Sequence, residues 1–254
     1  MKRTLAWGLP LLSLFLTVLS LDCTLKNCPV NLPNSNAPTA TPTCYIYTDS
    51  YGSNTLANYD TYDQSWTAAT PAALSIQITS GEFQVGSPST ITYSYAIVNN
   101  STFNQSLGDY TVEGDFNLGT VGQGVFGVIS RATPASFHAY IFQWNGLNNR
   151  WEIEKQIGVG TYYYPGTNSG SPYTLGTWVH LKAVISGNNF NCYETPETSP
   201  GVGLGATVTI FNGVSDPGTT APYTAGGAGI RAYNILGGNI LHLDNFSVKT
   251  PGCP

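Results

Sequence analysis

Charged residues are scarce in this sequence. Only 9% of the 254 residues are Asp, Glu, Lys or Arg, against about 25% in an ordinary soluble domain. The nine Lys and Arg residues are too few for the clustered basic surface with which proteins bind nucleic acid. Helix surfaces are normally built from Lys, Glu, Arg and Ala, so the shortage of charge also argues against a helical bundle. We therefore expect no nucleic-acid partner.

Basic residues are missing from one long stretch. No Lys or Arg lies between Lys26 and Arg131, whereas seven Asp and Glu residues do. An acidic region is a poor partner for phosphate groups or anionic lipid. Its carboxylates predict either solvated loops or ligands for Ca²⁺, which prefers hard oxygen donors.

The residues that are abundant predict a folded β protein. Hydrophobic residues make up 41% of the chain and aromatic residues 12%, which argues against disorder. The sequence contains 28 Gly, 16 Pro and 16 Tyr, but one Met. The length suits one large β domain, whose core is big enough to need no disulfides as its main support.

Residues 1–22 have the pattern of a secretory signal peptide, because Lys2 and Arg3 precede an apolar run from Leu5 to Leu21. The run is close to the minimum length for crossing a bilayer, so an uncleaved N-terminal anchor is the alternative. Cys23 directly after the run allows a third interpretation, a lipoprotein with lipid on this cysteine. We expect a secreted, extracellular or cell-surface protein whose membrane contact, if any, is this anchor or lipid.

The five cysteines predict disulfides in an oxidising compartment, because their spacings match no zinc motif. With Cys23 set aside for lipid, four cysteines allow three pairings, which are left open: Cys28, Cys44, Cys192 and Cys253. Residues 23–43 are rich in Pro, Asn and Thr and show no periodicity, which predicts a semi-extended tether. Residues 44–254 are expected to form one domain.

That domain is predicted to consist of β-strands throughout. Polar and apolar residues alternate in segments rich in Val, Ile, Thr and Tyr, the pattern of half-buried strands. Clusters of Gly, Pro, Asn and Ser between these segments predict turns. Strands at this spacing indicate an all-β antiparallel sandwich or barrel. The predicted strands are residues 74–78, 90–97, 110–116, 137–144, 151–157, 178–185, 206–211, 229–233 and 240–248.

Alternation also assigns side chains to faces of these strands. In residues 178–185 the core face is predicted to carry Val179, Leu181, Ala183 and Ile185, with His180 on the opposite face. In residues 137–144 we expect the face with His138, Tyr140 and Trp144 to be wet, because it bears polar and aromatic groups that could meet a ligand.

Several segments, in order, are similar to a known family. They are Thr48-Asp-Ser-Tyr51, residues 124–131, residues 176–182 and Leu243-Asp-Asn-Phe-Ser-Val248. Together they resemble concanavalin-A-like (LamG-like) lectin and glucanase jelly-roll domains over about residues 45–249. The resemblance implies two antiparallel sheets packed face to face, one of them concave. Members of the family bind glycans, hydrolyse them or serve in adhesion, so the resemblance does not fix a function. Residues 193–205 look like an insertion that Cys192 would pin.

Aromatic side chains are the best candidates for a glycan site, because the apolar face of a sugar ring stacks on an aromatic ring. Tyrosine offers a large contact area at low entropic cost, and an arginine offers forked hydrogen-bond donors. Residues 162–164 are three tyrosines before a proline and are expected to project from a turn. Packing in the core is the alternative for each aromatic residue. The predicted ligand-binding residues are Arg131, Tyr140, Trp144, Tyr162, Tyr163 and Tyr164.

An enzyme is the less favoured interpretation. Glycoside hydrolysis uses two carboxylates, and glucanases with this fold carry them in a Glu-x-Asp-x-x-Glu strand. Glu113-Gly-Asp115 supplies the first two acids, but no third Glu follows, and Glu152 and Glu154 lie beside Lys155 in a segment that looks structural. There is no Gly-x-Ser-x-Gly motif, and the three histidines lie on separate predicted strands. No catalytic residue is predicted.

A structural Ca²⁺ is the one cofactor that the resemblance implies. Similar jelly rolls hold such an ion between the start of the domain and its closing strand. The matching residues here are Asp49 and Asp244. The alternative is that backbone N–H groups alone satisfy these carboxylates.

These observations favour an exported, non-catalytic module that binds a polysaccharide or other glycan, or mediates adhesion, through a concave sheet face and loops. Two alternatives stay open: a glycoside hydrolase or lyase on the same fold, and a structural component of an extracellular surface or fibre.

Overall fold

The structure is a computed structural model that describes residues 44–86, 93–120, 123–203, 205–216, 218, 220–233, 235 and 238–251. The predicted signal peptide and tether lie outside the described residues, as do Cys23, Cys28 and Cys253. All described residues belong to one unit, residues 43–254. None of the helices in the described ranges is long and apolar enough to cross a membrane.

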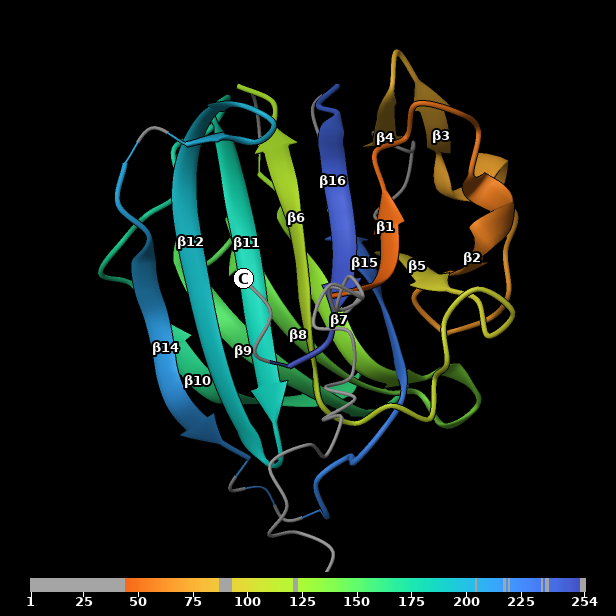
Figure 1. Cartoon of the computed structure of the whole chain (residues 1–254), viewed down its shortest axis with the longest axis vertical. Helices are drawn as coiled ribbons and strands as arrows, with labels where there is room; N and C mark the ends of the chain where they lie inside the picture. The colour runs from red at the N-terminus through yellow and green to blue at the C-terminus, as the bar shows by residue number, and fades with distance from the viewer. Residues whose placement is uncertain are drawn as a thin grey trace, which may run out of the picture. The chain divides into compact units, whose positions relative to one another are not determined.

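Two antiparallel sheets stack as layers, with β6, β11, β12 and β16 in the nearer layer of Figure 1. The nine-stranded sheet contains β1 (Tyr45–Asp49), β3 (Ile76–Thr79), β4 (Glu82–Val85), β6 (Tyr110–Leu118), β11 (Trp178–Ser186), β12 (Asn189–Ser199), β13 (Val202–Gly203), β14 (Val208–Ser215) and β16 (Leu241–Lys249). The seven-stranded sheet contains β2 (Tyr59–Tyr62), β5 (Tyr93–Val98), β7 (Val125–Thr133), β8 (His138–Asn145), β9 (Arg150–Gly158), β10 (Thr161–Asn168) and β15 (Gly227–Tyr233). The predicted all-β fold is confirmed as a two-sheet sandwich. Three short 3₁₀ helices, Leu56–Asn58, Pro71–Leu74 and Pro134–Ser136, connect strands.

Segments that are far apart in the sequence become neighbours in the nine-stranded sheet. The last strand, β16, pairs with β6 and with β4, and the first strand, β1, pairs with β16. Strand β11 pairs with β6 on one side and with β12 on the other. The central strands of this sheet therefore come from three separate parts of the sequence.

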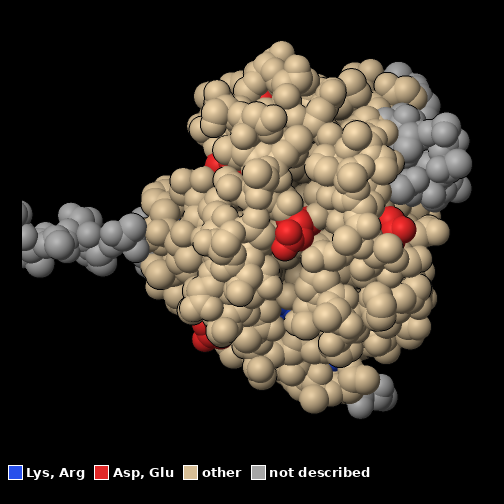
Figure 2. Space-filling model, turned by 90° about the vertical axis from the view of Figure 1, so that its right-hand side faces the viewer, with Lys and Arg blue, Asp and Glu red and all other residues tan. Residues whose placement is uncertain are grey.

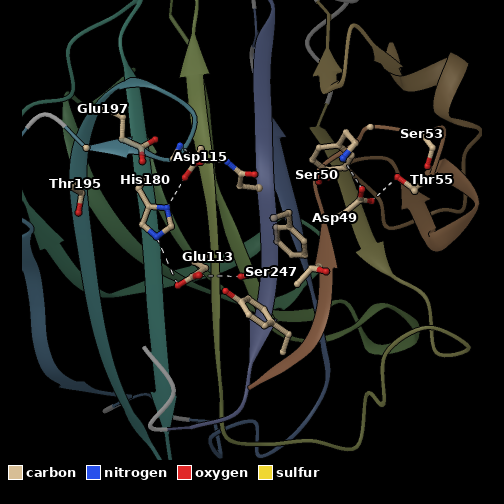
Figure 3. Close-up of a pocket in the computed structure, with 18 residues that line it drawn as sticks. Asp49, Ser50, Ser53, Thr55, Glu113, Asp115, His180, Thr195, Glu197 and Ser247 are labelled. Carbon is tan, nitrogen blue, oxygen red and sulfur yellow. Dashed lines mark hydrogen bonds and ion pairs between the residues drawn. The ribbon is translucent and has the colours of Figure 1, made fainter. Parts of the chain in front are cut away.

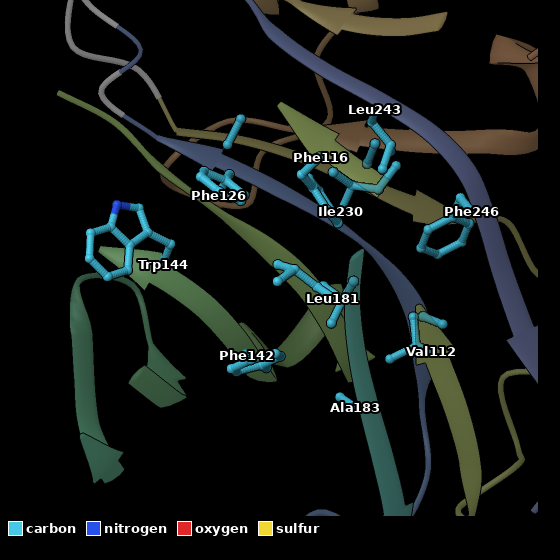
Figure 4. Packing of buried hydrophobic residues seen from close by; sticks show 14 of the residues in the cluster. Val112, Phe116, Phe126, Phe142, Trp144, Leu181, Ala183, Ile230, Leu243 and Phe246 are labelled. Atoms are coloured by element: carbon cyan, nitrogen blue, oxygen red, sulfur yellow. The ribbon is translucent and has the colours of Figure 1, made fainter. Parts of the chain in front are cut away.

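The core lies between the sheets (Figure 4). Phe116 and Leu181 from the nine-stranded sheet and Phe126 and Phe142 from the seven-stranded sheet are all at most 3% exposed. Val179, Leu181, Ala183 and Ile185 are buried as the alternation predicted. Removing this much apolar surface from water is the main favourable contribution to folding.

The face of residues 137–144 that is predicted to be wet instead faces the core between the sheets. Tyr140 and Trp144 are buried in the main core, at 0% and 2% exposure. The opposite face of β8 carries Ala139 and Ile141, which are buried in a second cluster together with Trp66. Both faces of β8 are covered, so alternation could not distinguish inside from outside here.

Two local expectations are also corrected. Residues 162–164 belong to strand β10 and not to a turn; the turn comes earlier, at Gly160, whose φ of 63° suits glycine. Pro165 is tolerated because β10 is an edge strand of its sheet. Cys192 is buried and free, so it does not pin the inserted segment through a disulfide.

Shortening a side chain of the core should destabilise the folded protein. Leu181 is fully buried, so Leu181→Ala should lower the free energy of unfolding by about 2–5 kcal/mol through lost burial and the cavity left behind. Val208 is 38% exposed, and Val208→Ala should change it by about 0.5 kcal/mol or less. Urea denaturation measures both variants, and equal effects would contradict the assigned core.

Candidate functional site

A pocket of about 930 Å³ lies on the outer face of the nine-stranded sheet, opposite the core (Figure 3). Its floor is formed by side chains of β6, β11, β12 and β16, and its rim by β1 and the loop after it. The lining is rich in carboxylate, hydroxyl and amide groups. The polar side chains that line it are Thr48, Asp49, Ser50, Ser53, Thr55, Glu113, Asp115, His180, Thr195, Glu197, Asn245 and Ser247.

Strand alternation and register together create this polar floor. On β6, Glu113 and Asp115 alternate with the buried core residues Val112 and Phe116. Asp115 lies directly opposite His180 of β11. A pair that is directly opposite on one face has its Cβ atoms about 4.5–5.5 Å apart, so the two side chains must interact.

The segment that looked like an insertion completes the pocket. Strand β12 continues to Ser199 and returns as the short strand β13. The turn between them contains Gly201, whose φ of 73° favours glycine. The N–H of Gly201 donates to Asp115 Oδ2 at 2.9 Å, which holds the hairpin against the sheet and brings Glu197 to the floor.

Asp115 and His180 form the centre of the site. His180 Nδ1 lies 2.5 Å from Asp115 Oδ1, and the amide of Asn245 donates to Asp115 Oδ2 at 2.8 Å. His180 Nε2 lies 3.8 Å from Glu113 Oε2, so the imidazole lies between two carboxylates. Burial disfavours its charge, but the hydrogen bonds and charges of both carboxylates outweigh this and raise the pKa of His180 to about 9.

Glu113 is fixed in its charged form. Its Oε1 accepts hydrogen bonds from Ser247 at 3.0 Å and from Lys249 Nζ at 2.7 Å. Burial opposes ionisation, but the hydrogen bonds of His180 and Lys249 and their charges are stronger, and they lower the pKa of Glu113 to about 2. The negative charges of Glu113 and Asp115 are thus matched by two cations at neutral pH.

Glu197 differs from the other acids of the pocket. It is 5% exposed, and its Oε2 atom accepts no hydrogen bond from the described residues. Burial and the nearby charge of Asp115 raise its pKa to about 7, although His180 and the N–H of Gly201 act in the opposite direction. Glu197 therefore brings a buried, unsatisfied polar group to the wall of the pocket.

Three of these residues have ligand atoms at the spacing of a metal site. Asp115, His180 and Glu197 each offer one atom, and these lie within 4.8 Å of one another. A metal ion needs a deprotonated imidazole. The pKa of about 9 keeps His180 protonated at neutral pH, so the imidazolium already occupies the place of a cation. A metal ion at this position would therefore have to displace the proton of His180.

The structure places three of the predicted ligand-binding residues in the interior. Tyr140 and Trp144 are core residues, and Arg131 is 1% exposed. The guanidinium of Arg131 donates to three backbone carbonyls, those of Gly108, Tyr223 and Gly187, and pairs with Asp109. These side chains have no exposed surface for a ligand; their role is to connect loops and to fill the core.

The three tyrosines of β10 lie away from the large pocket. Tyr162 is 46% exposed, and its ring meets Tyr164 edge to face at 5.6 Å. The hydroxyl of Tyr163 donates to Asp216. Asp216 also binds Lys155 at 2.5 Å in a fully buried ion pair.

Of the two residues predicted for calcium, Asp244 accepts a hydrogen bond from the N–H of Asn245 at 2.7 Å, and Asp49 is held by several donors. The carboxylate of Asp49 already accepts hydrogen bonds from the hydroxyls of Tyr47, Thr55 and Tyr59 and from the N–H of Tyr51. Ca²⁺ requires six to eight oxygen ligands with free lone pairs. Three of the four donors to Asp49 are hydroxyls, so backbone N–H groups alone do not satisfy it, and calcium binding here stays a prediction.

The sequence showed the acids of the pocket but not their meeting with His180. Alternation assigns Glu113, Asp115 and His180 to polar strand faces, yet His180 is 65 positions from Asp115. Their contact depends on the pairing of β6 with β11, which no local pattern specifies. The suspected insertion was the one signal that could have drawn attention to Glu197.

Comparisons with known proteins give the fold. No protein-family model and no curated protein matches the chain. A Bacillus licheniformis beta-glucanase is similar over 80% of this chain and 97% of its own, with 13% identity and a TM-score of 0.50. The carbohydrate binding module CBM66 from Bacillus subtilis is 13% identical over 75% of this chain and 96% of its own, with a TM-score of 0.49. The lectin UEA-II complexed with galactose is 8% identical over 80% and 97%, with a TM-score of 0.44. The beta-glucanase, with its TM-score of 0.50, is a concanavalin-A-like jelly roll, so the resemblance is confirmed at the level of the fold.

The stability of the protein should fall as the pH rises from 7 to 9. In the unfolded chain His180 loses its proton near pH 6.5, whereas in the folded state it keeps the proton up to about pH 9. The protonated His180 therefore stabilises the fold fully below pH 6.5, and this stabilisation is lost as the pH rises from 6.5 to about 9. His180→Gln should flatten this decline, which we expect to be on the order of 1–3 kcal/mol. Burial and Lys155 lower the pKa of His138, so His138→Gln should keep the decline. Urea denaturation at several pH values tests this, and an unchanged slope in His180→Gln would contradict it.

Proposed function

We propose that this protein is an exported module that binds a neutral glycan in the large pocket without cleaving it. The observation that carries the proposal is the unpaired Oε2 atom of the buried Glu197, which faces a pocket full of hydroxyl, amide and carboxylate groups. A buried acceptor without a partner costs free energy that a ligand hydroxyl would recover.

The charge of the pocket disfavours an anionic ligand. Asp115 and Glu113 are balanced by His180 and Lys249, and Asp49 adds a further carboxylate to the lining, so no surplus positive charge is present to bind phosphate or sulfate. The wider surface agrees with this. The face drawn in Figure 2 shows isolated acidic side chains and almost no Lys or Arg. Neutral, hydroxyl-rich ligands suit such a surface.

The size and the rim of the pocket also fit a glycan. Ligand pockets usually have volumes of about 300–1,000 Å³, and this one is near the upper end at about 930 Å³. Tyr45 lies at the rim with 52% exposure and offers a ring on which a sugar could stack. The similar structures named above include a carbohydrate binding module and a lectin; their likeness concerns the fold, and the support for this function comes from the pocket itself.

Glycan binding should depend on the floor and the rim of the pocket. On an array of neutral polysaccharides, Tyr45→Ala and Glu197→Ala should each weaken binding about tenfold or more, because one removes a stacking ring and the other a buried acceptor. Glu82→Gln is the matched control: Glu82 also pairs with a histidine, His242, on the same sheet, but outside the pocket. No binding by the folded protein, or binding unchanged in both variants, would refute the proposal.

Cleavage of a glycan is the second candidate, and one observation favours it. Glu113 and Glu197 line the same pocket with pKa values of about 2 and about 7. Opposite shifts of this kind are typical of a carboxylate and an acid that act as a pair. Binding is favoured over cleavage because Glu113 is already held by Ser247 and Lys249.

An assay for release of reducing sugar separates the two functions. For a binding module, the wild-type protein releases no sugar from the polysaccharides that it binds. Sugar release that is lost in Glu197→Gln, a variant that keeps the shape of the side chain but cannot donate the proton of an acid, would establish the hydrolase instead. Glu82→Gln again serves as the control.

A further inference from the structure

The outer face of the other sheet carries a separate, smaller pocket. Its volume is about 150 Å³, and it shares no lining residue with the large pocket. Strands β5, β7, β8, β9, β10 and β15 contribute to it, together with the turn between β8 and β9. The lining combines tyrosines with a buried ion pair, that of Arg231 and Glu154.

This ion pair is incompletely satisfied. Arg231 Nη1 contacts Glu154 Oε2 at 2.8 Å, and both residues are only 2% exposed. Arg231 Nε and Glu154 Oε1 make no hydrogen bond within the described part of the chain. A donor and an acceptor of one ion pair are therefore buried without partners, although native proteins satisfy nearly all such groups.

The chemistry of these two atoms restricts what can bind. An anion would meet the carboxylate of Glu154, and a cation would meet the guanidinium of Arg231, so each would be repelled by one partner. A hydroxyl group can accept from the Nε–H and donate to the Oε1 atom of the carboxylate. The pair thus suits a neutral ligand with hydroxyl groups.

Tyrosine rings surround this polar centre. Tyr93 and Tyr233 stack with their centroids 3.8 Å apart, and the guanidinium of Arg231 lies 5.0 Å from the centroid of Tyr93. Tyr162 and Tyr164 form another wall of the pocket, and Tyr162 is 46% exposed. Aromatic walls around a polar centre complement a sugar ring, which has apolar C–H faces and a polar edge of hydroxyls.

The polar centre is held rigidly from below. Gln143 donates to Glu154 Oε2 at 3.1 Å and to Glu152 Oε2 at 3.0 Å, and its own oxygen accepts from Arg231. Asn145 donates to Glu152 Oε2 at 2.9 Å. A site whose groups are fixed before binding loses little conformational freedom when the ligand arrives.

We infer that this pocket is a second binding site, which takes a single neutral sugar ring. Its volume equals about five water molecules at ~30 Å³ each, enough for the hydroxyl-bearing edge of one ring and too small for a chain. The site is independent of the proposed function, because its residues, its sheet and its size all differ from those of the large pocket. A protein with both sites would hold a glycan chain on one face and a single or terminal sugar on the other.

NMR titration of the full-length protein with D-glucose, D-galactose and D-xylose tests this inference. We expect saturable shifts at the amides of the small pocket with one of these sugars, with a dissociation constant in the millimolar range. Leu147 lies at the pocket with 40% exposure, so Leu147→Trp should block it without disturbing the core and weaken binding at least tenfold. Val159→Trp, at a position 49% exposed outside the pocket, is the matched control and should bind normally.

Tyr162→Ala provides a second test, because it removes an aromatic wall that is already half exposed, and it too should weaken binding. Glu197→Ala, in the large pocket, should leave these shifts unchanged. An absence of saturable shifts with all three sugars, or shifts that persist in Leu147→Trp, would overturn the inference. Shifts lost in Glu197→Ala but kept in Leu147→Trp would assign the binding to the large pocket, which would overturn this second site and leave the proposed function intact.

Discussion

The carboxylate of Asp115 is the group on which the large pocket depends. It binds His180 of β11, the amide of Asn245 on β16 and the N–H of Gly201 in the hairpin after β12. These contacts join three separate parts of the sequence at one point on the outer face of the sheet. The same charge helps to keep His180 protonated and Glu197 protonated up to about pH 7. Geometry and electrostatics of the pocket therefore have a common origin.

Of the six Lys and Arg residues in the described ranges, four are buried. Lys155 is fully buried against Asp216, Arg231 against Glu154, and Arg131 is surrounded by carbonyl oxygens. A buried ion pair is costly to break, because the remaining charge would lack a partner in a medium of low dielectric constant. These pairs fix particular strands and loops to one another. They also leave a surface of Tyr, Asn, Thr, Ser and Gly, which suits neutral partners better than charged ones.

The pockets on the two outer faces of the sandwich contain similar chemical groups but differ in volume. Each pocket has a buried polar group that finds no partner among the described residues, a network of hydrogen bonds that holds it, and tyrosine rings at its edge. In the large pocket the hairpin of residues 193–203 and the segment around β1 build walls over the sheet. In the small pocket only side chains and one turn rise above it. The difference in volume follows from this difference in the loops, while the sheets supply the rigid floor of both.

The sequence by itself determined nine of the sixteen strands in the described residues, because alternating polar and apolar residues can bury one face of a sheet only in the extended conformation. It also determined the core face of β11, where the alternation is unambiguous. It did not determine the inner face of β8, because Ala139 and Ile141 on one side are as buried as Tyr140 and Trp144 on the other. Only the tertiary structure decided that Arg131 is internal, that residues 162–164 lie in an edge strand, and that Glu197 reaches Asp115 and His180. These features depend on which strands pair and in which register, and such pairing brings together residues whose separation in the sequence no local pattern encodes.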